Sequence, residues 1–224
     1  MNKLLIKLQL LSILVPNGKS AFIKKYIPEN GKVMDVGCGN NSPYRTKILR
    51  SDIYYIGLDI GIYNQSSDVN EYADEFIIVK PEKFHQAIEQ YSNELDTVIS
   101  AHNLEHCNDY SQVIGTMLNS LNRGGYLYLS FPCEDSVHFP SRKKGTLNFY
   151  DDSTHKHIIS FESIIQTIEL SGFSVIFARK KYRPFFLFFL GLLCEPFARI
   201  TNRVLPYITW ALYGFETVII AKKM

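Results

Sequence analysis

Two glycines and two aspartates have the types and spacing of a ligand-binding turn. Gly37 and Gly39 form a Gly-x-Gly turn directly after the apolar run 33–36, and Asp35 lies within that run. Glycines here can adopt positive φ and let a ligand approach the backbone closely. Asp59 ends a second apolar run, where a carboxylate can accept both hydroxyls of a ribose. The pattern predicts a cofactor containing adenosine, bound where strand order reverses in an α/β sheet.

Two cofactor classes compete for this turn. A dinucleotide fingerprint needs a third glycine or an alanine, but Ser42 stands at that position, and Pro43 lacks a backbone donor that a pyrophosphate would use. Asp35 would repel the pyrophosphate, whereas it suits an α-amino group and a sulfonium. S-adenosylmethionine is therefore favoured, and an NAD-binding oxidoreductase is the weaker alternative.

The motifs DVGCGNN, GLD, DTVISAHNLEH and LNRGGYLYLSFP occur in the order and spacing of class I S-adenosylmethionine-dependent methyltransferases. The chain resembles that family over residues 30–180 and its last strand, with Asn41 where the family usually has a third glycine. The resemblance implies a Rossmann-like α/β fold, a three-layer α/β/α sandwich around a seven-stranded, mostly parallel sheet. Its last strand would be antiparallel, in a hairpin of 173–179 and 215–222.

The resemblance also assigns cofactor contacts to the ends of the first four strands. Asp35 and Gly37 would line the methionine end of the cofactor. Asp59 would bind the ribose, and Val79 would flank the adenine. The full set of implied contacts is Asp35, Gly37, Cys38, Gly39, Asp59, Ile60, Val79, Ala101 and His102, the last two facing the reacting centre.

Methyl transfer to a hydroxyl also needs a general base within hydrogen-bond reach. The nearest supply follows the fourth strand, where His102, Glu105 and His106 lie close together. His106 and His102 are therefore candidate catalytic bases. An acid and a histidine at this place can equally support the cofactor pocket without removing a proton.

The loop 145–161 carries further acidic and imidazole side chains, among them Asp151, Asp152 and His155. It follows the fifth strand, on the rim where an acceptor would bind, so His155 is a third candidate base. Carboxylates and imidazoles can bind a divalent metal, but no defined spacing supports a site and none is expected. The loop can also be a plain polar turn capped by the aspartates.

Strands and helices must alternate to position these residues. Continuous apolar runs indicate parallel strands covered on both faces. Helices are expected at the N-terminus, after Ser42 as N-cap, over 81–91, from Asp109 to Gly124-Gly125, and over 160–173. The expected strands are 31–37, 53–60, 74–80, 96–101, 126–132, 173–179 and 215–222.

The composition describes an ordinary globular protein, expected to form a single domain over residues 1–224. The net charge of +2 does not indicate a nucleic-acid partner. Four scattered cysteines without a CxxC pair fit a reduced, cytoplasmic compartment. The first residues resemble a signal peptide, but Lys7 and Gln9 interrupt the apolar run, and an amphipathic helix ended by Pro16 is favoured.

The segment 182–214 fits no repeat of the strand–helix pattern and is strongly aromatic and apolar. Its apolar stretch 184–194 is too short to span a bilayer. It is expected to be a helical insertion before the last strand. Such an insertion can pack on the sheet edge, form a homodimer face, or touch an anionic membrane surface with the help of basic residues 179–183. The last reading makes the protein peripheral at the inner membrane face.

The stretches SAHNLEHCND and FPSRKKGTLNFYDDSTH are similar to a bacterial group associated with polysaccharide biosynthesis. That similarity favours a sugar hydroxyl as acceptor. The sequence therefore predicts a methyltransferase that uses S-adenosylmethionine and acts on an oxygen of a glycan or another small-molecule acceptor. A non-catalytic subunit with the same fold is the alternative from another functional class.

Overall fold

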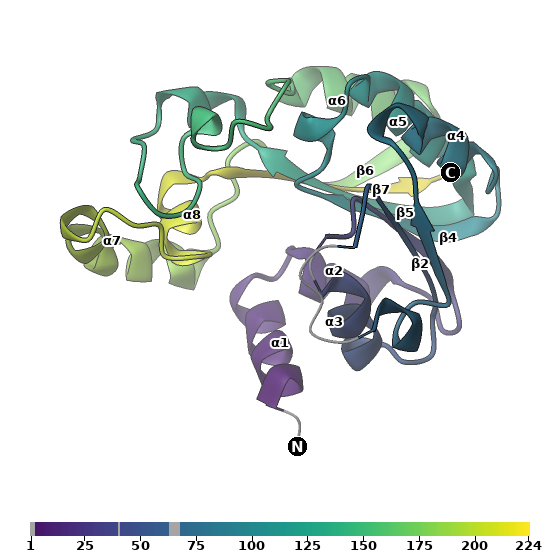
Figure 1. Cartoon of the computed structure of the whole chain (residues 1–224), viewed down its shortest axis with the longest axis horizontal. Coiled ribbons are helices and arrows are strands. Elements are labelled where there is room, and N and C mark those ends of the chain that lie inside the picture. The colour runs from purple at the N-terminus through teal and green to yellow at the C-terminus, as the bar shows by residue number, and fades with distance from the viewer. Residues whose placement is uncertain (1–2, 40, 63–67) are drawn as a thin grey trace.

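The computed structural model describes residues 3–39, 41–62 and 68–224. Within them lies a seven-stranded sheet of order β3-β2-β1-β4-β5-β7-β6 (Figure 1). All strands are parallel except β7, which is antiparallel to its neighbours β5 and β6. This confirms the predicted fold class. The strands are β1 (Lys32–Val36), β2 (Tyr54–Asp59), β3 (Glu75–Ile78), β4 (Leu95–Ala101), β5 (Leu121–Pro132), β6 (Phe173–Arg179) and β7 (Glu216–Lys223).

Helices cover both faces of the sheet and complete three layers (Figure 1). One face carries α4 (Phe84–Glu89), α5 (Tyr110–Ser120) and α6 (Phe161–Leu170). The other carries α1 (Lys3–Leu14), α2 (Lys19–Tyr26) and α3 (Ser42–Leu49). On each face, apolar side chains of the helices pack with those of the strands into one cluster. The central strands are thus covered on both faces, which is why their apolar runs are continuous.

The segment 182–214 contains two helices. It forms α7 (Phe185–Ile200) and α8 (Ile208–Tyr213), after which the chain enters β7. Because β7 is antiparallel, its first residue lies at the carboxyl ends of the parallel strands, and α7 and α8 lie beyond that edge (Figure 1). Leu187 and Ala211 pack into the same apolar cluster as α2. The two helices therefore border the edge where α/β sheets bind ligands.

Three local features differ from the predictions. Helix α2 has no predicted counterpart, because its buried residues 21–23 are contiguous and give no helical period. Helix α5 ends at Ser120, since Leu121 already pairs with β4 and begins β5. Ser42 is not the N-cap of α3: the cap is Asn41, and its side chain makes no capping hydrogen bond.

The strand register brings the candidate residues to one edge of the sheet. Asp35 in β1 is paired with Gly57 of β2 and with Ile99 of β4. The turn after β1 therefore lies between the ends of β2 and β4, where Asp59 and His102 occur. Strand order reverses between β1 and β4, so the turn occupies the expected ligand-binding position.

Candidate functional site

The Gly-x-Gly turn after β1 has a backbone that glycine and asparagine adopt readily. The φ angles of Gly37, Gly39 and Asn41 are +70°, +62° and +58°. A Cβ atom built on Gly37 would lie 2.3 Å from Oδ1 of Asn103, in the loop after β4. Gly37 therefore has no room for a side chain, and Asn41 has the left-handed conformation expected of a residue that replaces glycine.

Asp59, at the end of β2, fastens this turn. Its Oδ2 accepts the N–H of Gly39 at 2.6 Å, and its Oδ1 accepts the N–H of Ile60 at 2.7 Å. Burial raises the pKa of the Asp59 carboxyl, and the two N–H donors act in the opposite direction. Oδ2 also accepts the Cys38 thiol at 3.7 Å, so Oδ1 is the oxygen that keeps lone-pair capacity for a hydroxyl group of a ligand.

A cavity of about 570 Å³ opens beside the turn. Its size lies within the range of roughly 300–1,000 Å³ that is usual for small-molecule sites. We call it the glycine-turn pocket, and its walls include Gly37, Gly39, Asp59, Ile60, His106 and Thr154. It joins the ends of β1, β2 and β4 to the loop 145–161.

Asp35 does not line this pocket, contrary to the expectation that it faces the methionine end. Its side chain is fully buried. Its Oδ2 accepts hydrogen bonds from Lys19 Nζ at 2.6 Å, Ser42 Oγ at 2.6 Å and Tyr55 Oη at 2.7 Å. Asp35 therefore holds Lys19 in place, and Lys19 is the residue of this pair that lines a cavity.

Val79 also lies elsewhere than predicted. Successive side chains of an extended chain point in opposite directions. Because Ile78 is exposed, Val79 turns inward and packs against the apolar core on the α4–α5 face. Pro81 and Phe84, which follow in the chain, line the glycine-turn pocket in its place.

His102 has a left-handed backbone with φ of +52° and lies between two carboxylates. Its Nε2 is 2.8 Å from Oε1 of Glu216, and its Nδ1 is 3.3 Å from Oε1 of Glu105. Burial lowers the pKa of His102, but the hydrogen bond with Glu216 and the neighbouring carboxylate of Glu105 outweigh burial and raise the pKa to about 10. The raised pKa favours the protonated imidazole at neutral pH, which disfavours His102 as a general base, and that role stays a prediction.

This ion cluster predicts a pH dependence of stability. The folded pKa of His102 is about 10 against an ordinary 6.5, so its stabilising contribution is complete below pH 6.5 and disappears as the pH rises toward 10. We expect the free energy of unfolding, measured by urea titration, to fall across this window. His102→Asn keeps a residue that tolerates the left-handed backbone and should flatten that slope. An equal slope in the variant would assign the pH dependence to other groups.

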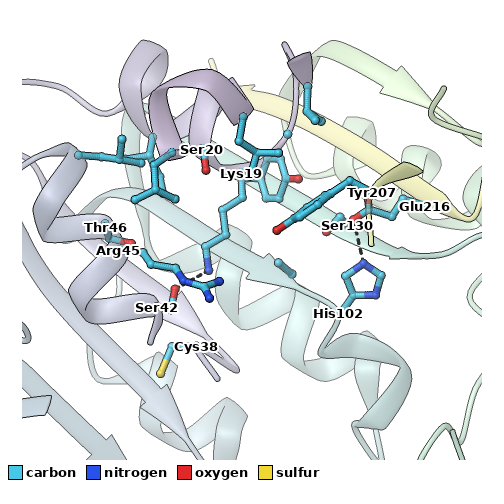
Figure 2. Close-up of a pocket in the computed structure, with 18 of the residues that line it drawn as sticks. Lys19, Ser20, Cys38, Ser42, Arg45, Thr46, His102, Ser130, Tyr207 and Glu216 are labelled. Atoms are coloured by element: carbon cyan, nitrogen blue, oxygen red, sulfur yellow. Dashed lines mark hydrogen bonds and ion pairs between the residues drawn. The ribbon is translucent and has the colours of Figure 1, made fainter. Parts of the chain in front are cut away.

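A second cavity, which we call the Lys19 pocket, lies among α1, α2, α3 and α8. Figure 2 shows Lys19 and Arg45 on one side of it and Tyr207 and Glu216 on the other. The remaining lining includes polar groups of Ser42, His102 and Ser130 and apolar side chains of Leu8, Leu11, Leu49 and Trp210. This cavity therefore combines a polar floor with an apolar wall.

The Gly-x-Gly turn and His102 separate the two cavities. Gly37 and Gly39 line the glycine-turn pocket, whereas Cys38 and Ala101 line the Lys19 pocket. His102 lines both. Two ligands, one in each cavity, would therefore come close to each other beside His102. Burial raises the pKa of the Cys38 thiol, so this residue is not a thiolate nucleophile.

Several lining residues have no signal in the sequence. Lys19 and Glu216 lie far from the motifs, and only the fold brings them to Asp35 and His102. Tyr207 has a φ of +63°, which bulky residues rarely adopt, and such strain is typical of functional positions. The Trp210 ring lies beside that of His102, with ring centroids 5.1 Å apart and planes tilted by 34°.

The loop 145–161 contacts the glycine-turn pocket and not the Lys19 pocket, because Thr154 and Lys156 line the former. Asp151 caps a turn in this loop, because its Oδ2 accepts the N–H groups of Leu147 and Asn148 at 3.0 and 2.9 Å. The loop therefore adjoins the pocket proposed for the cofactor, although its position after the fifth strand predicts a place on the acceptor side.

The other two candidate bases lie next to each other. The ring of His106 is 4.9 Å from that of His155, centroid to centroid. His106 lines the glycine-turn pocket, and His155 lies behind it with little exposed surface. Neither histidine lines the Lys19 pocket. Their roles as bases stay predictions.

Comparisons with known proteins agree with this architecture. Residues 15–177 match the profile of the family described as "Methyltransferase domain", and the chain therefore belongs to that family. A solved S-adenosylmethionine-dependent methyltransferase from Archaeoglobus fulgidus has 18% sequence identity and a TM-score of 0.57, covering 99% of this chain and 95% of its own. No curated protein matches the sequence.

Two further solved structures have similar folds. One is a putative methyltransferase of Haloferax volcanii in complex with the activator Trm112, with 14% identity, a TM-score of 0.63, and coverage of 99% of this chain and 98% of the other. The second is an S-adenosylmethionine-dependent methyltransferase from Mesorhizobium loti, with 15% identity, a TM-score of 0.58, and coverage of 90% and 95%. At such identities the likeness concerns the fold.

Proposed function

We propose that the protein transfers the methyl group of S-adenosylmethionine to an oxygen of a small-molecule or glycan acceptor. The observation that carries this proposal is the glycine-turn pocket of a methyltransferase-family chain, with the Asp59 carboxylate in its wall. When bound, the cofactor supplies an electrophilic methyl group on a sulfonium. The protein must then position an acceptor and accept its proton.

The residues of the glycine-turn pocket fit the adenosine part of this cofactor. Asp59 would accept a ribose hydroxyl at Oδ1, beside the N–H of Ile60 that this oxygen already accepts, and a second hydroxyl would displace the long 3.7 Å contact of the Cys38 thiol with Oδ2. Ile60 and Phe84 offer apolar surface for the adenine. Gly37 and Gly39 keep the wall free of side chains where the cofactor passes the turn. The fit supports S-adenosylmethionine as the cofactor, in agreement with the family and with the solved S-adenosylmethionine-dependent methyltransferases of similar fold.

The Lys19 pocket is the proposed acceptor site, because it meets the cofactor pocket at His102. Glu216 lies on its floor, with Oε1 bonded to the His102 imidazolium. A carboxylate there can receive the hydroxyl proton, whereas protonated His102 cannot. Asp35 is buried and paired with Lys19, so it does not contact the acceptor or receive its proton. Glu216 therefore replaces the histidines as the first candidate base.

The acceptor chemistry can be tested with methyl-labelled S-adenosylmethionine and a panel of nucleotide sugars and glycan precursors. Transfer to a hydroxyl gives a methyl ether, which survives mild alkali, whereas a methyl ester of a carboxylate is hydrolysed to methanol. Alkali-stable label that is lost in Glu216→Gln supports the proposal. Alkali-labile label would show that the acceptor is a carboxylate and not a hydroxyl.

We also propose that α1 and α7 rest on an anionic membrane surface, at the inner membrane face of the cytoplasm. The two helices contact each other and present large apolar side chains to solvent. Isolated exposed apolar residues are common, but a gathered set marks an interaction surface. This set, the apolar surface, is Ile6, Leu10, Ile13, Phe185, Phe186, Phe189, Leu190, Leu192, Leu193, Phe197 and Ile200.

Charge favours a lipid occupant for the apolar surface. Lys3 and Lys7 are exposed on α1, which has no acidic residue. The one carboxylate of α7, Glu195, is buried and paired with Arg142 and Arg199. Cations beside apolar side chains suit anionic headgroups, whereas a two-fold dimer would bring like charges together. In the described residues, no helix is both long and apolar enough to cross a bilayer.

Vesicle sedimentation tests this surface. We expect binding to vesicles that contain anionic phospholipid, weakened by salt, and reduced about tenfold or more in Leu193→Glu, since one fully buried large apolar side chain contributes about 1.5–3 kcal/mol. Leu193 is 80% exposed, and Leu170 on α6 is a matched control at 81%. Leu170→Glu should bind as the wild type does. A dimer that Leu193→Glu dissociates, without vesicle binding, would assign the surface to a second copy.

A further inference from the structure

The buried carboxylate of Glu105 faces two imidazoles behind the glycine-turn pocket. One ligand atom each of Glu105, His106 and His155 lies within 4.8 Å of the others. Glu105 is fully buried, and neither carboxylate oxygen receives a hydrogen bond within the described part of the chain. Its Oε1 lies 3.3 Å from Nδ1 of His102. A buried carboxylate without hydrogen bonds is costly, so this arrangement needs a further positive partner.

Hydrogen bonds set both histidines in one tautomer. His155 Nδ1 lies 2.6 Å from the carbonyl oxygen of Phe149, which can only accept a proton. His106 Nδ1 lies 3.2 Å from the carbonyl oxygen of Thr154 and 2.9 Å from its hydroxyl, whose own hydrogen goes to Asp152. Both Nδ1 atoms are therefore donors, and both Nε2 atoms are left with lone pairs. Metal-bound histidines are commonly oriented by such carbonyl contacts.

The net charge of the cluster also favours a cation. The carboxylates of Glu105 and Glu216 lie on either side of the His102 ring, at 3.3 and 2.8 Å from its nitrogens. Asp152 adds a carboxylate oxygen 3.9 Å from Nε2 of His155. His106 lines the glycine-turn pocket, which gives an ion a path of entry.

We propose that Glu105, His106 and His155 bind a divalent first-row transition-metal ion of the zinc class. Two imidazoles and a carboxylate suit zinc, manganese, iron or cobalt, whereas magnesium and calcium prefer oxygen ligands alone. Bonds of about 2.0–2.2 Å place neighbouring ligand atoms about 3.4 Å apart, so the three side chains close slightly around the ion.

The ion would fasten the loop 145–161 to the segment after β4. The N–H groups of Lys156 and His157 already donate to the carbonyl of Glu105, at 2.8 and 3.3 Å. Because Thr154 and His106 both line the glycine-turn pocket, the metal would join two parts of its wall. The site adds a structural element that the proposed methyl transfer does not itself require.

Metal binding can be measured without any activity. Tag-free protein is freed of metal with a chelator and titrated with Zn²⁺ by calorimetry and with Co²⁺ by visible absorption, which reports the ligand field. We expect one equivalent of each metal, with affinity reduced about a hundredfold or more in His155→Ala, because a directly coordinating ligand is lost. His157→Ala is the matched control, since His157 lies in the same loop but bonds the carbonyl of Asn108.

Glu105→Gln tests the carboxylate, and circular dichroism shows whether that variant folds. If it does not fold, His155→Ala and His106→Ala carry the test. No Co²⁺ absorption and no Zn²⁺ heat with the wild type would overturn the proposal, as would unchanged affinity in His155→Ala. Titration of the same samples with S-adenosylhomocysteine tests the proposed function separately. If the protein binds S-adenosylhomocysteine but no metal, only the metal proposal fails.

Discussion

Gly37→Ala is expected to destabilise the protein by about 2–5 kcal/mol, which combines an unfavourable left-handed backbone with a steric clash. The added Cβ would lie 2.3 Å from Asn103 Oδ1 and 2.5 Å from Asn103 Cβ, at a φ of +70°. Relief of this clash must move either the turn or the loop after β4, and both form the glycine-turn pocket. Urea unfolding measures the loss of stability, and calorimetry should show cofactor affinity lost along with it.

Two other glycines separate backbone strain from crowding. A Cβ on Gly39 meets nothing nearer than 3.9 Å, so Gly39→Ala should cost only the left-handed strain of about 1–2 kcal/mol. Gly115 lies inside α5 with nothing within 4 Å, and Gly115→Ala should stabilise the protein by about 0.5–1 kcal/mol. Equal effects at Gly37 and Gly39 would show that Asn103 yields and that the close approach has no structural role.

Asp59→Ala is expected to weaken cofactor binding by about 1.5–3 kcal/mol, because charge-assisted hydrogen bonds to the ribose are lost. The variant also releases the N–H groups of Gly39 and Ile60, which Asp59 holds at 2.6 and 2.7 Å. Asp59→Asn should bind weakly too, since its amide nitrogen would face one of these donors. Calorimetric titration with S-adenosylhomocysteine measures both variants.

The control for this prediction is Asp135→Ala. Asp135 is paired with Lys181 and lines neither the glycine-turn pocket nor the Lys19 pocket. It should bind S-adenosylhomocysteine as the wild type does. If Asp59→Ala binds S-adenosylhomocysteine with unchanged affinity, Asp59 does not bind the ribose and the adenosine lies elsewhere.

The fold could be predicted because its signals are local. Continuous apolar runs mark the strands, glycines mark the turn, and Asp109 caps α5 by accepting the N–H of Gln112 at 2.9 Å. The first helix follows from apolar spacing alone, with Leu8 buried. The position of Asp59 at the end of β2 follows from the same pattern. Each of these features depends on residues close together in the chain, and such local patterns can be read from the sequence.

The chemistry of the site could not be predicted in the same way, because it depends on pairs distant in the sequence. Asp35 is an acidic residue in the expected place, but its role changes once Lys19 and Tyr55 bond to it. His102 has the spacing of a base, yet Glu216, from the last strand, helps to make it an imidazolium. The charge state of a residue depends on its partners, and only the folded chain brings these partners together.

The most direct test of the central claim is calorimetric titration of the purified protein with S-adenosylmethionine and S-adenosylhomocysteine, with NAD in a parallel cell. We expect both sulfur compounds to bind at one site per chain, competing with each other, and NAD to give no heat. That result would place a methyltransferase cofactor in this fold and justify the search for the acceptor. Binding of NAD alone would indicate an oxidoreductase, and binding of none of the three would indicate a methyltransferase fold that serves as a non-catalytic subunit.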